Sequence, residues 1–186
     1  DVFDRQMQTT ASVFLDRLCN AVALEGKDKE VLHDCIEELR RISEKKNLGL
    51  RTIEQLFSHI VRAIVSTPPN NFKNAVFLTG LAVLKVLEPA LFRKAKSGSL
   101  RFSEIVDILG LEVSVDPVQG EASLVSPYKR NWIEKLWRLA IDPDCPPEII
   151  QEMGPMFVGY SLWGREHLVP FVANELIDRF QPVVKQ

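Results

Sequence analysis

Apolar residues recur at helical spacing along almost the whole of this 186-residue sequence, and this feature limits the fold more than any other. In successive segments they stand three or four positions apart, so each segment carries one apolar stripe when it is coiled into an α-helix. The segments with this pattern are 12–24, 28–46, 50–66, 72–97 with a break at Pro89, 103–109, one from 131, one from 147, and 166–180. We therefore predict an all-α protein, a helical bundle of about eight helices.

Residues typical of helix ends mark several of these boundaries. Asp28 is predicted to cap the second helix, and Asn131 with Glu134 resembles a capping box at the start of a later one. Pro147 is predicted to be the first residue of another helix, because proline fits the first turn. The clearest predicted helix ends are at Asn47, Thr67 and Gly98.

Segment 72–87 is apolar on almost all sides rather than along one stripe. Lys73 and Lys85 leave only about a dozen uncharged residues between them, fewer than the roughly 20 that a membrane-spanning helix needs. We predict that this segment is the central helix of the core, and that this chain has no transmembrane segment.

The pattern changes at residue 112. Segment 112–128 is rich in valine, proline, glycine and serine and has no helical period, so we interpret it as a linker or exposed loop. It divides the chain into two helical subregions, 1–111 and 129–186, joined by this one irregular connection. No internal repeat of fixed period is visible, which disfavours a solenoid.

Composition excludes several classes of protein. Hydrophobic residues make up 46% and charged residues 26% of the chain, which is typical of a globular protein and not of a disordered one. The net charge of −2 excludes a uniformly basic protein that wraps nucleic acid.

The cysteines and histidines predict no disulfide framework and no metal site. Cys19, Cys35 and Cys145 are odd in number and lack CxxC spacing, which indicates reduced thiols and a cytoplasmic location. The three histidines are equally dispersed. The chain begins at Asp1 without an initiator Met or an apolar leader, so we expect a part of a longer protein without a signal peptide.

No catalytic motif is visible, but Arg51 stands at a position suited to anion binding. It lies in the predicted first turn of the third helix, nearly opposite the apolar stripe that contains Ile53 and Ile60. A cation there is disfavoured by the helix dipole, yet it would add to the positive backbone N–H groups that hold phosphates at helix starts. Geometry alone leaves two interpretations open, an anion site and a solvated surface arginine.

Arg51-Thr52-Ile53-Glu54 resembles the sensor-2 pattern, Arg-x-Ile-Glu, in the helical lids of AAA+-type P-loop NTPases. More closely, residues 48–109 resemble the carboxyl-terminal helical part of KAP-family P-loop NTPases. The pieces that carry this resemblance, in order, are LGLRTIEQLFSHI, an apolar helix, Glu88-Pro89-Ala90-Leu91-Phe92-Arg93-Lys94, Ser97-Gly98 and Phe102-Ser103-Glu104-Ile105.

The resemblance implies that 1–111 is a lid-like region and that Arg51 approaches the γ-phosphate of ATP bound by a neighbouring core. Gly49 departs from the Ser or Asn cap that is more usual, and the Walker A loop and Walker B carboxylate are missing. The chain alone would therefore have no catalytic residue and no cofactor, whereas the full-length protein would bind ATP and Mg²⁺ and could act as an ATPase. Its partner would be its own NTPase core or another protein. The alternative is a free-standing all-α module for protein–protein interaction, without nucleotide binding.

Two further groups of side chains are candidates for partner contact. A basic patch is formed by Arg93, Lys94, Lys96 and Arg101. It could meet nucleic acid or anionic lipid, but cations are also favoured at a helix carboxyl end, and the negative net charge makes nucleic acid the less favoured partner. Trp132, Trp137 and Trp163 are interpreted as mostly core residues, some of which line a partner groove.

Overall fold

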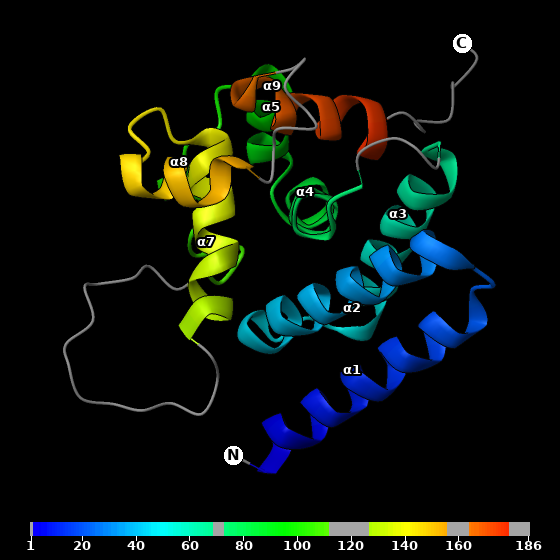
Figure 1. Ribbon diagram of the computed structural model, residues 1–186. Coiled ribbons are helices and arrows are strands. Elements are labelled where there is room, and N and C mark those ends of the chain that lie inside the picture. Colours follow the sequence, from blue (N-terminus) through cyan, green and yellow to red (C-terminus); the bar gives the residue numbers. More distant parts are fainter. Residues whose placement is uncertain (1, 69–72, 112–126, 156–163, 179–186) are drawn as a thin grey trace.

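The computed structural model describes residues 2–68, 73–111, 127–155 and 164–178. Within these ranges the protein is all-α, with nine α-helices, one π-helix and no strand, which confirms the predicted fold class (Figure 1). The helices are α1 (Val2–Ala21), α2 (Gly26–Lys46), α3 (Leu50–Ser66), α4 (Ala75–Leu87), α5 (Pro89–Ser97), α6 (Phe102–Ile105), α7 (Pro127–Ile141), α8 (Pro147–Met153), α9 (Arg165–Phe171) and the π-helix η2 (Val172–Ile177).

Helix α4 is the centre of the bundle, as predicted. Every residue from Val76 to Leu84 is buried, and α2, α3, α5 and η2 pack around it. Figure 1 looks along α4 and shows these neighbours on several sides of it. No helix in the described ranges combines the length and apolarity needed to cross a bilayer.

Several predicted helix ends follow local chemistry and are confirmed. Helix α2 ends at Asn47, whose φ of 51° is left-handed and whose N–H donates to the Ser43 carbonyl. Gly98 ends α5 in the same region of φ, at 71°. Pro147 is the first residue of α8, as its missing N–H favours.

Three predicted helix starts are wrong. Helix α2 begins at Gly26, so Asp28 is not its cap but lies in the first turn, where it pairs with Lys73. Helix α7 begins at Pro127, so Asn131 lies inside it rather than at its start. Helix α1 begins at Val2 rather than near residue 12, and the apolar row of Leu15 and Ala11 continues through Met7 to Phe3 at i, i+4 spacing.

The predicted last helix, 166–180, changes type after Pro170. This proline has no N–H to donate to the helix ladder, and α9 passes into η2 just beyond it. The Asn174 side chain occupies the altered turn, donating from Nδ2 to the Pro170 carbonyl at 2.9 Å and to the Lys96 carbonyl at 3.0 Å. The π-helix is thereby attached to α5.

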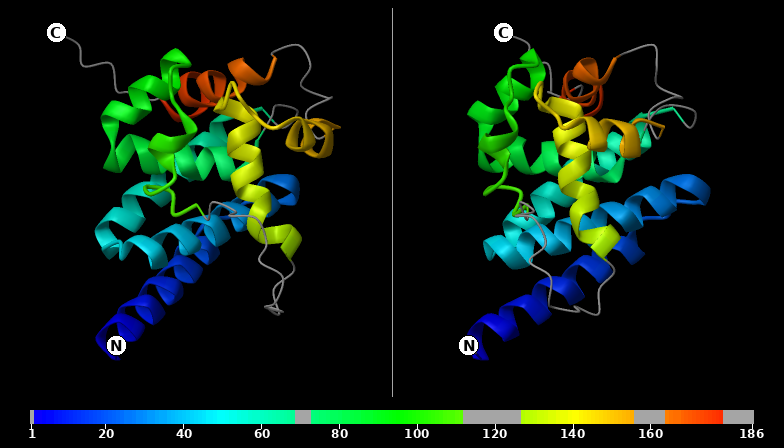
Figure 2. Two further views of the ribbon diagram at one scale, coloured as in Figure 1. Left: turned by 90° about the vertical axis from the view of Figure 1, so that its left-hand side faces the viewer. Right: turned by 60° about the vertical axis from the view of Figure 1, so that its left-hand side comes forward.

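Helices from both ends of the chain share one core. Val172 and Leu176 of η2 belong to the same buried cluster as the residues of α3 and α4. Trp137 of α7 is fully buried and meets Phe77 edge to face, with ring centroids 5.0 Å apart. Figure 2 shows α9 and η2 lying against α5 on one side of the bundle. The predicted connection, 112–128, lies outside the described residues except for 127 and 128, which belong to α7.

Candidate functional site

Arg51 lies on the outer face of α3, one residue after the helix begins. Its side chain is exposed, whereas Ile53 is fully buried beneath the same turn. Gly49 precedes the helix and supplies no side-chain cap, and the first turn contains no acidic residue. No hydrogen bond or ion pair joins Arg51 to another residue of the described ranges. The guanidinium is therefore available to an outside anion.

The rest of α3 has the two faces that the sequence predicts. Its buried residues are Ile53, Leu56, Phe57, Ile60, Ala63 and Ile64. Gln55 and Arg62 are exposed on the side of Arg51. His59 is partly buried, and its pKa lies below the usual value because of burial and the nearby charges of Lys85 and Arg62. It is therefore mainly neutral at pH 7, which leaves Arg51 and Arg62 as the cations of this helix.

The basic patch is partly neutralised within the fold. Lys94 pairs with Glu104, and Lys96 pairs with Asp178, whereas Arg93 and Arg101 are exposed. The hydrogen bond from Lys94, followed by that from the Arg101 backbone N–H, lowers the pKa of Glu104. Two of the four predicted cations thus serve internal contacts, so the patch is a weaker anion surface than its sequence suggests.

Asp178 connects the carboxyl end of η2 to two other helices. Its carboxylate accepts from Lys96 of α5 and lies 3.1 Å from Nζ of Lys85 of α4. Lys85 also donates to the Ile177 carbonyl at 2.9 Å. Burial raises the pKa of Asp178, but the hydrogen bonds from Lys96 and Lys85 and their charges outweigh it, so the pKa lies below its usual value.

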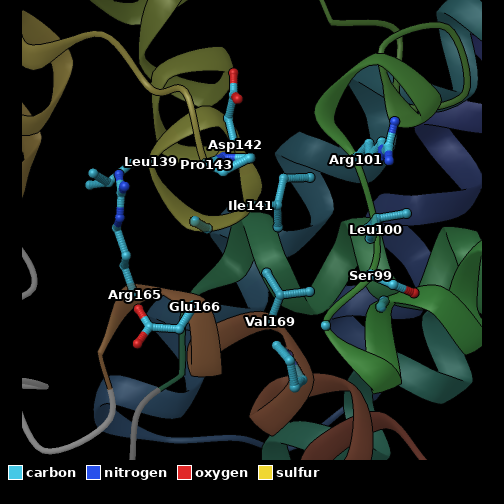
Figure 3. Close-up of a pocket in the computed structure, with 14 residues that line it drawn as sticks. Ser99, Leu100, Arg101, Leu139, Ile141, Asp142, Pro143, Arg165, Glu166 and Val169 are labelled. Carbon is cyan, nitrogen blue, oxygen red and sulfur yellow. The ribbon is translucent and has the colours of Figure 1, made fainter.

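A cavity of about 470 Å³ lies between the end of α5, α7 and α9 (Figure 3). Arg101 and Arg165 stand on opposite sides of it, with the apolar side chains of Ile141 and Val169 between them. Arg165 Nη1 is buried from solvent, so it does not face the open space. The two arginines do not converge on one point, and the cavity has no evident anion cradle.

A larger space of about 750 Å³ lies between α2 and α7, which we call the α2–α7 groove. Its lining includes Val31, Asp34 and Glu37 of α2, and Trp132 and Ile133 of α7; the start of α4 and Glu152 of α8 complete it. The sequence did not predict this groove, because its sides come from distant segments. The only sequence signal was the tryptophan on a predicted helix of the second subregion.

The three cysteines are free thiols, and two of them, Cys35 and Cys145, are buried. Burial raises the pKa of Cys35 to about 12, well above that of a reactive cysteine. In the described ranges, no three side chains of His, Cys, Asp or Glu gather closely enough to hold a metal ion.

Comparison with models of known protein families, with curated proteins and with solved structures finds no match to this chain. The resemblance to KAP-family NTPases therefore stays a prediction that rests on the sequence motifs.

Proposed function

We propose that the chain is a helical accessory region of a KAP-like P-loop NTPase, which senses the nucleotide state and contacts protein partners but does not catalyse alone. The observation that carries the proposal is the position of Arg51. The Arg-Thr-Ile-Glu segment begins a helix, buries Ile53 and leaves the guanidinium exposed, without a partner in the described part of the chain. A sensor arginine needs this combination of a fixed backbone and a free charge.

In this role Arg51 would approach the γ-phosphate of ATP held by the NTPase core. A shift of α3 that follows from this contact would be passed to α2 and α4, because the buried face of α3 packs on both helices. We propose a cytoplasmic location on the basis of the three free thiols. The pairing of Lys94 and Lys96 with carboxylates supports protein rather than nucleic acid as the partner.

The test measures steady-state ATPase rates of the complete protein with Arg51→Ala and Arg51→Lys. Loss of an arginine that stabilises the transferring phosphoryl group costs roughly a thousandfold or more in kcat. We expect a loss of this order for Arg51→Ala and partial activity for Arg51→Lys, which keeps the charge but not the bidentate geometry.

Arg62→Ala is the matched control, because Arg62 is an exposed arginine on the same helix. It should leave kcat unchanged. Unchanged turnover in Arg51→Ala would show that Arg51 is an ordinary surface residue. A complete protein without a Walker A loop would also overturn the proposal and leave the free-standing interaction module as the better interpretation.

A further inference from the structure

The α2–α7 groove presents apolar side chains that the core does not fully cover. Val31, Trp132 and Ile133 are each half-buried, and they pack against the core with one side while lining the groove with another. Tryptophan is enriched at protein interfaces because it offers a large apolar area at a small cost in conformational entropy. The floor of the groove is therefore suited to apolar side chains of a partner.

Among the described residues, the cations that line the groove are Arg41 and Lys73, and both are occupied by internal contacts. Arg41 binds both carboxylate oxygens of Glu38 and donates to the carbonyls of Leu109 and Gly110, at 2.9 and 2.8 Å. Lys73 pairs with Asp28, and its side chain is only 5% exposed. Neither cation is free to attract an anionic partner.

The carboxylates of the rim, by contrast, reach into solvent. Asp34 is exposed and has no ion-pair partner in the described ranges. Glu37 and Glu152 are 53% and 45% exposed, and their partners Arg40 and Lys135 are less exposed, at 23% and 28%. Such surface pairs contribute little free energy, so the carboxylates can exchange partners at small cost. As far as the described residues form it, the rim is therefore electrostatically negative around an apolar floor.

We propose that the α2–α7 groove binds a cationic amphipathic segment of a partner protein. The apolar residues of this segment would lie on Trp132 and Ile133, and its Lys or Arg residues would meet Asp34 and Glu37. This inference deepens the protein-contact part of the proposed function by naming the surface and the chemistry of the partner. It does not depend on Arg51 or on nucleotide, so the two proposals can fail separately.

The test uses a short synthetic peptide with leucines at i, i+3, i+4 and i+7 spacing, flanked by lysines, and titrates it into the full chain. Calorimetry gives Kd. We expect saturable binding that weakens as salt is added, and a Kd at least about tenfold higher for Asp34→Lys/Glu37→Lys. Trp132→Ala should weaken binding independently of charge. Arg51→Ala should leave Kd unchanged.

The matched control is Asp144→Lys/Glu175→Lys, which changes the net charge equally at exposed sites outside the groove. It should not alter Kd. Equal binding of a peptide with glutamates in place of the lysines, no binding at all, or an unchanged Kd in the groove variant would overturn the proposal. A dimer of the chain that Asp34→Lys/Glu37→Lys dissociates would overturn it as well, and would assign the groove to a second copy.

Discussion

The indole ring of Trp137 lies against Gly80 so closely that the backbone of α4 has no room for a Cβ at this position. The same missing Cβ would lie 3.3 Å from Cδ1 of Leu109. The absence of a side chain at Gly80 therefore allows α7 to approach the central helix, with Trp137 as the contact.

Gly80→Ala is expected to destabilise the protein although alanine is the better helix former. Overpacking a core costs about 1–3 kcal/mol, whereas the gain in helix propensity is about 1 kcal/mol. Urea denaturation should show a net loss of up to about 2 kcal/mol in the free energy of unfolding. The loss caused by Gly80→Ala should be smaller in a Trp137→Phe background, because phenylalanine lacks the ring atoms that lie against the added Cβ. A stabilised Gly80→Ala variant would contradict this close approach.

Arg41→Ala should destabilise the protein far more than Arg40→Ala. Arg41 neutralises Glu38, which is 5% exposed, and donates to the carbonyls of Leu109 and Gly110 in the turn after α6. Its loss leaves a buried carboxylate unpaired, which should cost about 2–4 kcal/mol. Within the described ranges Arg40 pairs with the more exposed Asp16 and Glu37, so its removal should cost about 1 kcal/mol or less. Equal losses in urea denaturation would refute this difference.

Asp178→Asn should destabilise the chain at pH 7 and lose its effect in acid. The pKa of Asp178 is lower in the folded chain than its ordinary value of 3.8, so the stabilisation by its charge is present above that pH. As the pH falls through the folded pKa, the carboxylate takes up a proton and this contribution disappears. At pH 7 we expect a deficit of about 1–3 kcal/mol for the variant, which shrinks as the pH falls below 3.8 and vanishes once the pH lies below the folded pKa.

The check is the free energy of unfolding of both proteins across this pH range. Asp144→Asn, at an exposed aspartate, is the control and should match the parent throughout. A deficit of Asp178→Asn that persists unchanged in acid would mean that shape, rather than charge, stabilises this contact.

Cys19 should react with iodoacetamide well before Cys35. Burial raises the pKa of Cys35 to about 12, so at pH 8 only about one molecule in ten thousand carries its thiolate. Cys19 also has a raised pKa through burial and the charge of Asp16, but it is partly exposed. Mass spectrometry of peptides from the labelled native chain measures the order, and labelling in urea should abolish it. Early modification of Cys35 in the native chain would contradict its burial.

Features of the fold that depend on neighbouring residues could be predicted from the sequence. Asn47 and Gly98 take the left-handed conformation that ends a helix, and Pro147 begins one because its ring fixes φ. The start of α7 was missed because Pro127, itself a good first residue, lies in a segment without apolar period. Local signals thus predicted several helix ends correctly. They did not show which of two possible first residues, Pro127 or Asn131, begins α7.

Features that join distant segments could not be predicted. Nothing in the sequence near Lys96 indicates that Asp178 will neutralise it, so the basic patch was predicted to be more positive than it is. The α2–α7 groove likewise needs Asp34 and Trp132 to be brought together by packing. Arg51 was located correctly as an exposed residue because its place follows from helix geometry alone.

The attachment of η2 to α3 and α4 determines how the chain can be divided. A fragment that stopped at residue 111 would lack Val172 and Leu176 and would expose the apolar surfaces that they cover on the central helices. Such a fragment would be prone to aggregate, although it contains the whole segment that resembles an NTPase lid. The helices of 1–111 and η2 should therefore unfold in one cooperative transition. Any transplant of the lid-like region into another protein must include η2 as well.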